Sequence, residues 1–160
     1  MGGFNVKKVF WALVICALFA SPTLAAMSDA DFIEFSKSAT LQQINEAISE
    51  GANVNAWDGH GWTPLKLAAA SIPNLSNPEV IIALIKAGAD VNARCSRGGT
   101  ALMFGVLSNN PNPEVITILL EAGADVDAVS AYGKTALDFA RQNEALKDTD
   151  AFQQLYEASR

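Results

Sequence analysis

Thiol and imidazole groups are scarce in this chain of 160 residues, which has two cysteines and one histidine. Cys16 lies in an apolar segment near the N-terminus, so Cys95 is the one cysteine of the remaining sequence, and the histidine is His60. A zinc site needs three or four converging ligands, and a disulfide needs two thiols within reach of each other. The sequence therefore excludes a zinc site built from Cys and His. It also excludes an internal disulfide once the N-terminal segment is removed.

The sequence also lacks the motifs that carry catalysis or bind cofactors. It has no glycine-rich phosphate loop, no paired-carboxylate motif and no cluster with metal-ligand spacing. His60 lies between Gly59 and Gly61, which indicates a turn, and a catalytic dyad would need a nucleophile within its reach. Cys95 is interpreted as a turn residue without a special role, with a reactive or intermolecularly paired thiol as the alternative. We therefore expect no enzyme activity, no cofactor and no metal.

Positive charge is in the minority, because 11 Lys and Arg face 17 Asp and Glu, for a net charge of −6. Without Lys7 and Lys8 of the N-terminal segment, nine cations face the same acids and the net charge is −8. Such a chain is repelled by the phosphates of nucleic acids and by anionic lipid surfaces. The net charge therefore favours a protein partner, and a basic one.

A long hydrophobic run is absent too. The uncharged run Val9–Ala20 follows two lysines and has 12 residues, whereas a helix needs about 20 to cross a bilayer. A Ser-Pro pair ends the run and small residues follow, an order typical of a secretory signal peptide. We predict a signal peptide over 1–26, cleaved after Ala25 or Ala26, and a periplasmic or secreted protein without membrane attachment. The alternative is an uncleaved anchor, which the short run disfavours; the lack of a cysteine at the cleavage site disfavours a lipid anchor.

The chain contains a self-similar unit. A hexapeptide of the form Gly-Ala-Asn/Asp-Val-Asn/Asp-Ala begins at Gly51, Gly88 and Gly123, with spacings of 37 and 35 residues. Each unit also has a Thr-x-Leu triplet at the same offset, at Thr63, Thr100 and Thr135. A unit repeated at this period indicates a stacked repeat protein. Stacked units build one continuous binding surface and leave little of the chain for catalytic machinery.

Each unit carries signals for two helices. Thr63-Pro64 opens a first helix, because Thr caps a helix and Pro is tolerated in the first turn. Asn-Pro-Glu triplets at 77–79 and 112–114 open second helices in the same way, and Gly88 ends one of them. The spacing predicts helices over 29–37, 41–50, 65–70 and about 148–159. Predicted buried stripes are Val80, Ile81, Leu84 and Ile85, then Val115, Ile116, Leu119 and Leu120, and finally Phe152 and Leu155.

The segment Asp-Gly-His-Gly-Trp-Thr-Pro-Leu-Lys-Leu-Ala-Ala (58–69), closed by Gly-Ala-Asp-Val-Asn-Ala (88–93), resembles the ankyrin repeat. The resemblance covers about 29–159. It implies an all-α ankyrin-repeat solenoid of about four helix-turn-helix units with short β-turn fingers. The implied units are an N-terminal capping repeat at 27–56, ankyrin repeats at 57–93 and 94–128, and a C-terminal capping repeat at 129–160.

Two departures from the family pattern stand out. The family's helix-opening histidine is replaced by Lys66, Met103 and Asp138, so we expect its hydrogen-bond bracing between repeats to be missing. The units are also longer than the usual 33 or so residues, with the excess at 72–76 and 108–111. The longer loop and the Asn-Pro-Glu-Val-Ile motif resemble bacterial members of the family.

The resemblance implies that partners bind to the fingers and to the first helices behind them. Exposed Trp, Tyr and Arg are the usual anchors of interfaces. Trp57 is interpreted as an exposed contact, whereas Trp62 is either a contact or packed on the neighbouring finger. Arg94 and Arg97 are either contacts or a solvated pair. The candidate protein-binding residues are Trp57, His60, Trp62, Arg94, Arg97, Tyr132 and Lys134.

The predicted function is non-catalytic protein–protein binding by a monomer in the periplasm, with inhibition of, or protection against, an envelope enzyme as its purpose. Two alternatives stay open within binding: a stress-linked accessory of a periplasmic enzyme, and a secreted host-directed effector. An enzyme of the envelope is the alternative from another class. It would need a convergent polar pocket, and the sequence supplies no motif for one.

Overall fold

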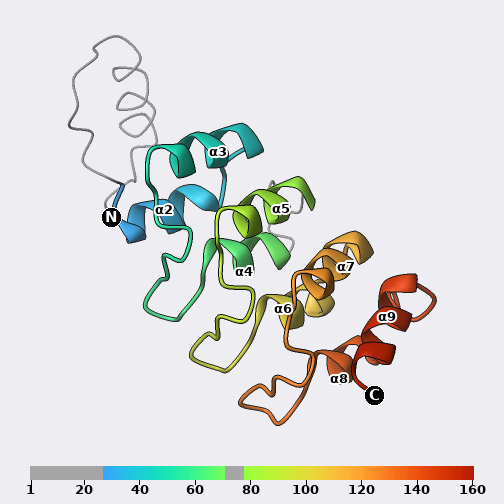
Figure 1. Ribbon diagram of the computed structural model, residues 1–160. Helices are drawn as coiled ribbons and strands as arrows, with labels where there is room; N and C mark the ends of the chain where they lie inside the picture. Colours follow the sequence, from blue (N-terminus) through green and yellow to red (C-terminus); the bar gives the residue numbers. More distant parts are fainter. Residues whose placement is uncertain (1–26, 71–77) are drawn as a thin grey trace, which may run out of the picture.

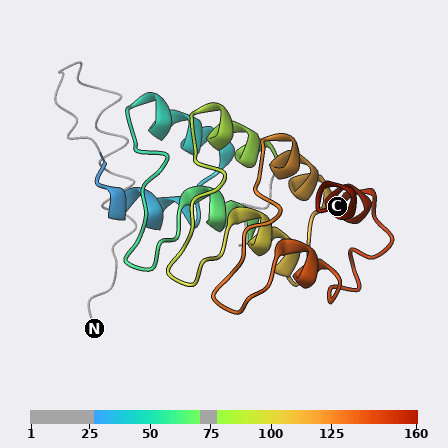
Figure 2. The ribbon, with the colours of Figure 1, turned by 60° about the horizontal axis from the view of Figure 1, so that its bottom comes forward.

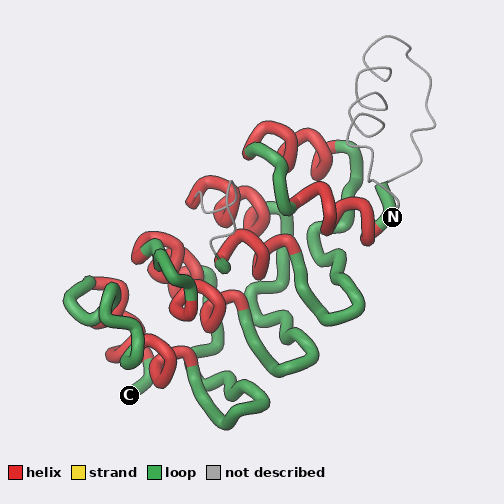
Figure 3. Tube along the Cα trace, turned by 180° about the vertical axis from the view of Figure 1, so that it is seen from behind, coloured by secondary structure: helices red, strands yellow, loops and turns green. Residues whose placement is uncertain are grey.

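The computed structural model describes residues 27–70 and 78–160. Within these residues the chain forms eight helices and no strand (Figure 3). The predicted signal peptide, the loop predicted at 72–76 and the Asn77 cap lie outside the described residues. The helices are α2 (Asp29–Ser36), α3 (Leu41–Ser49), α4 (Pro64–Ala69), α5 (Pro78–Lys86), α6 (Ala101–Leu107), α7 (Pro113–Glu121), α8 (Ala136–Ala140) and α9 (Asp150–Ala158).

The helices stack in two rows (Figures 1 and 2). In the inner row α2 contacts α4, α4 contacts α6 and α6 contacts α8, while in the outer row α3, α5, α7 and α9 contact one another in the same order. Three long turns, which we call the first, second and third fingers, project from the same side of the stack (Figure 1). Their tips are residues 57–62, 94–99 and 129–134. The predicted all-α stack of helix-turn-helix units with fingers is confirmed.

Threonine and asparagine caps start the helices where the sequence predicted. The Thr63, Thr100 and Thr135 hydroxyls each accept a backbone N–H three residues on, and each threonine has an extended backbone. The Asn112 side chain accepts the Glu114 backbone N–H, two residues on, at the start of α7. The last helix begins slightly later than predicted, because Thr149 provides its cap. The caps thus fix where each unit turns from finger to helix.

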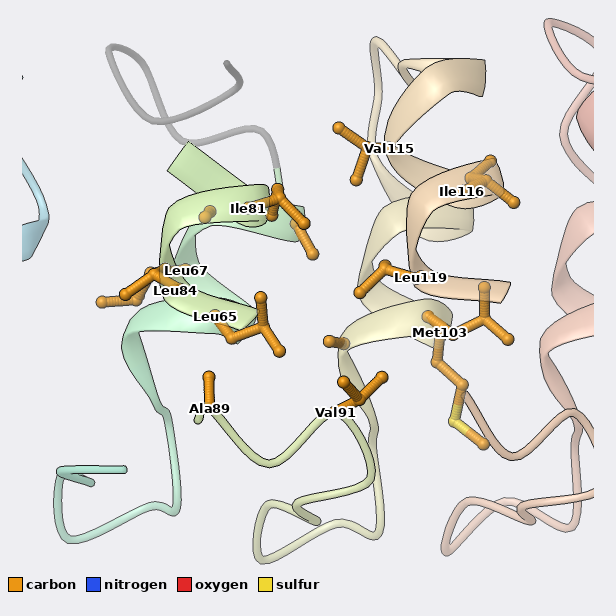
Figure 4. Packing of buried hydrophobic residues seen from close by; sticks show 14 of the residues in the cluster. Leu65, Leu67, Ile81, Leu84, Ala89, Val91, Met103, Val115, Ile116 and Leu119 are labelled. Atoms are coloured by element: carbon orange, nitrogen blue, oxygen red, sulfur yellow. The ribbon is translucent and has the colours of Figure 1, made fainter. Parts of the chain in front are cut away.

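Apolar side chains of the outer row fill the space between the rows. Ile81, Leu84, Ile116 and Leu119 are almost fully buried (Figure 4). The buried stripes are narrower than the sequence predicted, since Ile85, Leu120 and Phe152 are only partly buried and pack at the edge of the core. The inner row packs closely on small residues, namely Ala68, Ala69, Ala101, Ala136 and Ala140.

Hydrogen bonds brace successive units, and they come from the repeated hexapeptide and not from the histidine position of the family pattern. The Asn55 side chain donates to Gly88 O (2.9 Å) and accepts from Asp90 N (2.7 Å). Asn92 repeats the pattern one unit later, donating to Gly123 O (3.1 Å) and accepting from Asp125 N (2.7 Å). An amide carries a donor and an acceptor, so one asparagine in the hexapeptide ties two units together.

Lys66, at the family's histidine position, acts within its own unit instead. Its side chain is buried beneath the first finger, and Nζ donates to Gly61 O at 2.8 Å. Burial lowers the pKa of the Lys66 ammonium, and the nearby Cys95, Asp90 and Asp58 partly offset this effect. Lys66 therefore holds the finger against its helix rather than bracing the next unit.

Candidate functional site

Backbone hydrogen bonds hold the three fingers side by side. Ser96 N donates to His60 O, and Ala131 N donates to Arg97 O, both at 2.9 Å. Because the two bonds join equivalent places in successive units, equivalent side chains fall into rows across the fingers. One row is Trp57, Arg94 and Val129, and the other is His60, Arg97 and Tyr132.

The finger side of the molecule carries the exposed apolar groups. Trp57 is 63% exposed and Tyr132 is 66% exposed, as their interpretation as surface residues required. Leu107, the last residue of α6, and Val129 are also exposed, at 48% and 44%. In the part of the chain that the structure describes, no other large apolar side chain is exposed to this degree. Exposed apolar groups gathered on one face are typical of an interaction surface.

Trp62 is packed rather than free. Its ring lies on Phe104 of the next unit, with the centroids 4.3 Å apart and the planes tilted by 30°. Gly99 occupies the equivalent place in the second finger, where a Cβ would lie 3.0 Å from Phe104 Cζ and 3.2 Å from Cys95 Sγ. The missing side chain at Gly99 leaves room for the Phe104 ring. Trp62 therefore belongs to the floor of the surface, and the packing alternative holds.

A groove of about 480 Å³ opens between the fingers and the first helices of the last two units. Its volume falls in the range of ligand-binding clefts. Sequence reasoning missed Met103, Phe104 and Phe139, which line it from α6 and α8. Their signal was present: Leu67, Phe104 and Phe139 hold the same position in three successive units. The lining residues are His60, Trp62, Cys95, Ser96, Arg97, Gly99, Met103, Phe104, Leu107, Ser130, Tyr132 and Phe139.

Cationic side chains stand at the rim of this groove. Arg97 Nη1 lies 3.5 Å from the Tyr132 hydroxyl, to which it donates. Lys134 Nζ lies 5.7 Å from the centre of the Phe139 ring, within cation–π range, and donates to Gln142 Oε1 at 3.4 Å. The Arg97 side chain is exposed and that of Lys134 is half-buried.

The remaining candidates lie on the neighbouring hollow. Trp57, His60 and Arg94 line it together with Lys66 and Asp90. The Arg94 guanidinium donates to Val129 O of the next finger, so Arg94 helps to tie the fingers together. The structure thus places four of the seven predicted residues around the groove (His60, Trp62, Arg97 and Tyr132), Lys134 beside its Phe139 wall, and Trp57 and Arg94 one step away.

Cys95, a free thiol of intermediate exposure, lines both hollows. Among residues 27–70 and 78–160, no group of three or more His, Cys, Asp or Glu side chains is placed to hold a metal ion. Within the same residues, none of the helices has the length and apolarity to cross a bilayer.

Known proteins share the repeat. Over a 90-residue segment the chain is 36% identical to the mitochondrial disaggregases of Bos taurus and Homo sapiens. The segment is 56% of this chain but only 12% of each disaggregase, so the likeness concerns a small part of those proteins. Residues 74–159, more than half of the chain, match the family described as Ankyrin repeats (3 copies). Ankyrin repeats mediate binding to other proteins, and this chain belongs to the ankyrin repeat family.

Proposed function

We propose that this protein is an exported, non-catalytic binding module that docks one partner protein on its fingers and inner row. The observation that carries the proposal is where the exposed apolar side chains lie. Trp57, Val129 and Tyr132 belong to the fingers, and Leu107, at the end of α6, lines the groove together with Tyr132. A rigid stack whose exposed apolar groups share one face supplies anchors that are already in place, which reduces the entropic cost of docking.

The proposed compartment is the periplasm, and the proposed purpose is inhibition of, or protection against, an envelope enzyme. The N-terminal sequence supports export, with two lysines, an apolar run and small residues up to Ala26. We propose that the mature protein starts near Ala26 or Met27 and acts as a monomer. Recovery of the native protein from a periplasmic fraction, with an intact mass that lacks residues 1–26, tests the export step.

Binding is tested with a triple variant, Trp57→Ala, Arg97→Ala and Tyr132→Ala. The three side chains are exposed, so the variant should retain wild-type helicity while losing anchors that each contribute about 2 kcal/mol in a typical interface. The partner is first captured from a periplasmic extract with the wild-type protein and identified by mass spectrometry. It is then titrated against the wild type and the triple variant. Undiminished affinity of a folded triple variant would rule out the finger face and move the contact to the loop at 108–111.

Two other roles, an accessory of a periplasmic enzyme and a secreted effector, are distinguished by the activity of the captured partner and by the location of the mature protein. A periplasmic enzyme whose activity rises on binding would identify the protein as an accessory. Accumulation of the mature protein outside the cell would favour a secreted effector. Inhibition of a captured enzyme is the outcome that the proposed purpose requires.

A further inference from the structure

Charge is unevenly distributed over this acidic chain. Residues 91–113 and 128–137, which include the tips of the second and third fingers and all of α6, contain Arg94, Arg97 and Lys134 and no Asp or Glu. The helix behind the third finger, α8, adds one carboxylate, that of Asp138, which accepts two hydrogen bonds from Thr135 and lies near Lys134. The outer row differs, because its exposed side chains are rich in carboxylates. These are Glu46 on α3, Glu79 on α5, Glu114 and Glu121 on α7, and Asp150 and Glu157 on α9. The surface proposed to bind is thus locally cationic on a protein of net negative charge.

The groove combines this charge with an apolar floor. Trp62, Phe104 and Phe139 provide aromatic surface, and Leu107 lies exposed at its edge. Arg97 stands at the rim, and Lys134 lies over the Phe139 ring. None of the described residues that line the groove carries a carboxylate. A ligand here would meet apolar contacts at its centre and positive charge beside them.

We propose that the groove receives an acidic linear segment of the partner, with one large apolar side chain on the aromatic floor and carboxylates facing Arg97 and Lys134. This inference rests on the proposed function and specifies the partner. It reverses what net charge alone predicts, because short-range recognition depends on the charges at the surface of contact. Charges further away than about 10 Å are screened at ordinary salt.

The same surface disfavours a long polyanion. Nucleic acid or an anionic membrane needs many cations spread over a broad face, whereas here three are confined to two fingers and the acids of the outer row surround them. A short acidic segment can follow the groove and avoid those acids. The apolar floor would also stay uncovered by a phosphate backbone.

A library of displayed random linear peptides, selected on the native protein, supplies the probe. We expect enriched peptides to be negatively charged and to share one aromatic or large aliphatic residue, and their binding to weaken with added salt. The test variant is Arg97→Glu with Lys134→Glu. The control variant is Lys86→Glu with Arg160→Glu, which makes the same change in net charge away from the groove.

Synthetic copies of the enriched peptides should bind the test variant at least about tenfold more weakly than the wild type, and the control variant should bind nearly as well as the wild type. Leu107→Gln should also weaken the binding of these peptides, because their apolar residue is proposed to enter the groove. Circular dichroism verifies that all variants are folded. Enrichment of basic or uncharged peptides, no enrichment at all, or equal loss in both charge variants would overturn the inference.

A competition experiment separates this inference from the proposed function. If the captured partner loses affinity for the Trp57/Arg97/Tyr132 triple variant but is not displaced by acidic peptides, the finger face binds the partner and the acidic-segment inference is wrong. If the triple variant retains full affinity, the proposed function itself fails on this face. Displacement of the partner by the acidic peptides supports both.

Discussion

The central unit, with α6 and α7, and the last unit, with α8 and α9, use the same positions in different ways. The central unit has neighbours on both sides, because α6 contacts α4 and α8, and α7 contacts α5 and α9. At the helix-opening position Met103 is 1% exposed, whereas its counterpart Asp138 is partly exposed. Between two units the position is buried and holds Met103 here, or in the preceding unit Lys66 with its Nζ bonded to Gly61 O, whereas it carries a partly exposed carboxylate where one side is open.

The hexapeptides of the two units also differ in whether they bond to a following unit. The Asn92 amide links its unit to Gly123 O and Asp125 N. The last copy has Asp127 in this place, and in the described residues its carboxylate makes no bridge of this kind. At one small-residue position the central unit is the less favourable one for a helix, since α6 has Gly105 where α4 and α8 have Ala68 and Ala140. Each difference can be changed by one substitution.

The largest effect is expected from Leu119→Ala in the central unit. Leu119 is fully buried, and its truncation should leave a cavity that costs about 2–5 kcal/mol of unfolding free energy. Its counterpart Leu155 in α9 is equally buried, so Leu155→Ala should cost a similar amount. Only the central variant should also lose cooperativity, because a central unit supports both neighbours. Urea unfolding followed by circular dichroism measures both, and an unchanged midpoint for Leu119→Ala would contradict the packing in Figure 4.

The bracing amides give the next effect. Asn92→Ala removes two hydrogen bonds between units and should destabilise the protein by about 1–3 kcal/mol. Asp127→Ala is the matched control and should stay within about 0.5 kcal/mol of the wild type. Thermal denaturation of the two variants provides the comparison. Equal losses would mean that the bridge in the central unit contributes nothing.

Much of this architecture was predictable from the sequence, because it depends on local rules. Thr63, Thr100 and Thr135 mark the helix starts, and the repeated hexapeptide marks the ends of the units. Interactions that cross between units were not predictable in this way. Nothing in the single unit indicates that the Asn92 amide reaches Gly123. The expectation of a missing brace concerned the histidine position alone, and here a different residue type, at another position, does the bracing.

The candidate site shows the same limit. Exposure of Trp57 and Tyr132 followed from their places in the fingers, and their role in binding stays a prediction. The position of Trp62 depends on two residues of the next unit: Phe104 provides the ring on which it lies, and Gly99 leaves the space for that ring. Aligning successive units shows an aromatic residue at Phe104 and again at Phe139, which is the signal that would have revealed the floor of the groove.

A stabilising change is expected at Gly105. A Cβ added there would lie 3.8 Å from Ala69 O and 3.9 Å from Leu119 Cδ1, which is ordinary van der Waals contact. Gly105→Ala should therefore gain about 0.5–1 kcal/mol from the lower backbone entropy of the unfolded chain and the better helix propensity of alanine. A rise in the denaturation midpoint without loss of cooperativity is the expected result. A fall would show that the space between α4 and α6 is too tight for the methyl group that α4 and α8 carry at this position.

The smallest expected effect is a pH-dependent contribution of Asp138, in the last unit, to stability. The Asp138 carboxylate accepts the Thr135 backbone N–H at 3.0 Å and its hydroxyl at 3.1 Å, completing a capping box at the start of α8. The backbone hydrogen bond, followed by that from the hydroxyl, lowers the pKa of Asp138 below its ordinary value. A lowered pKa in the folded state means that the ionised group stabilises the fold above the ordinary aspartate pKa of about 3.9. This contribution is lost as the pH falls through the pKa of the folded state.

The Asp138→Asn variant should therefore melt at a lower temperature than the wild type at neutral pH. The gap between the two melting temperatures should close on acidification below about pH 4. Melting curves at a series of pH values test this, with Asp127→Asn as a control for the loss of one negative charge. A gap that persists unchanged in acid would show that the carboxylate acts through its shape and not through its charge.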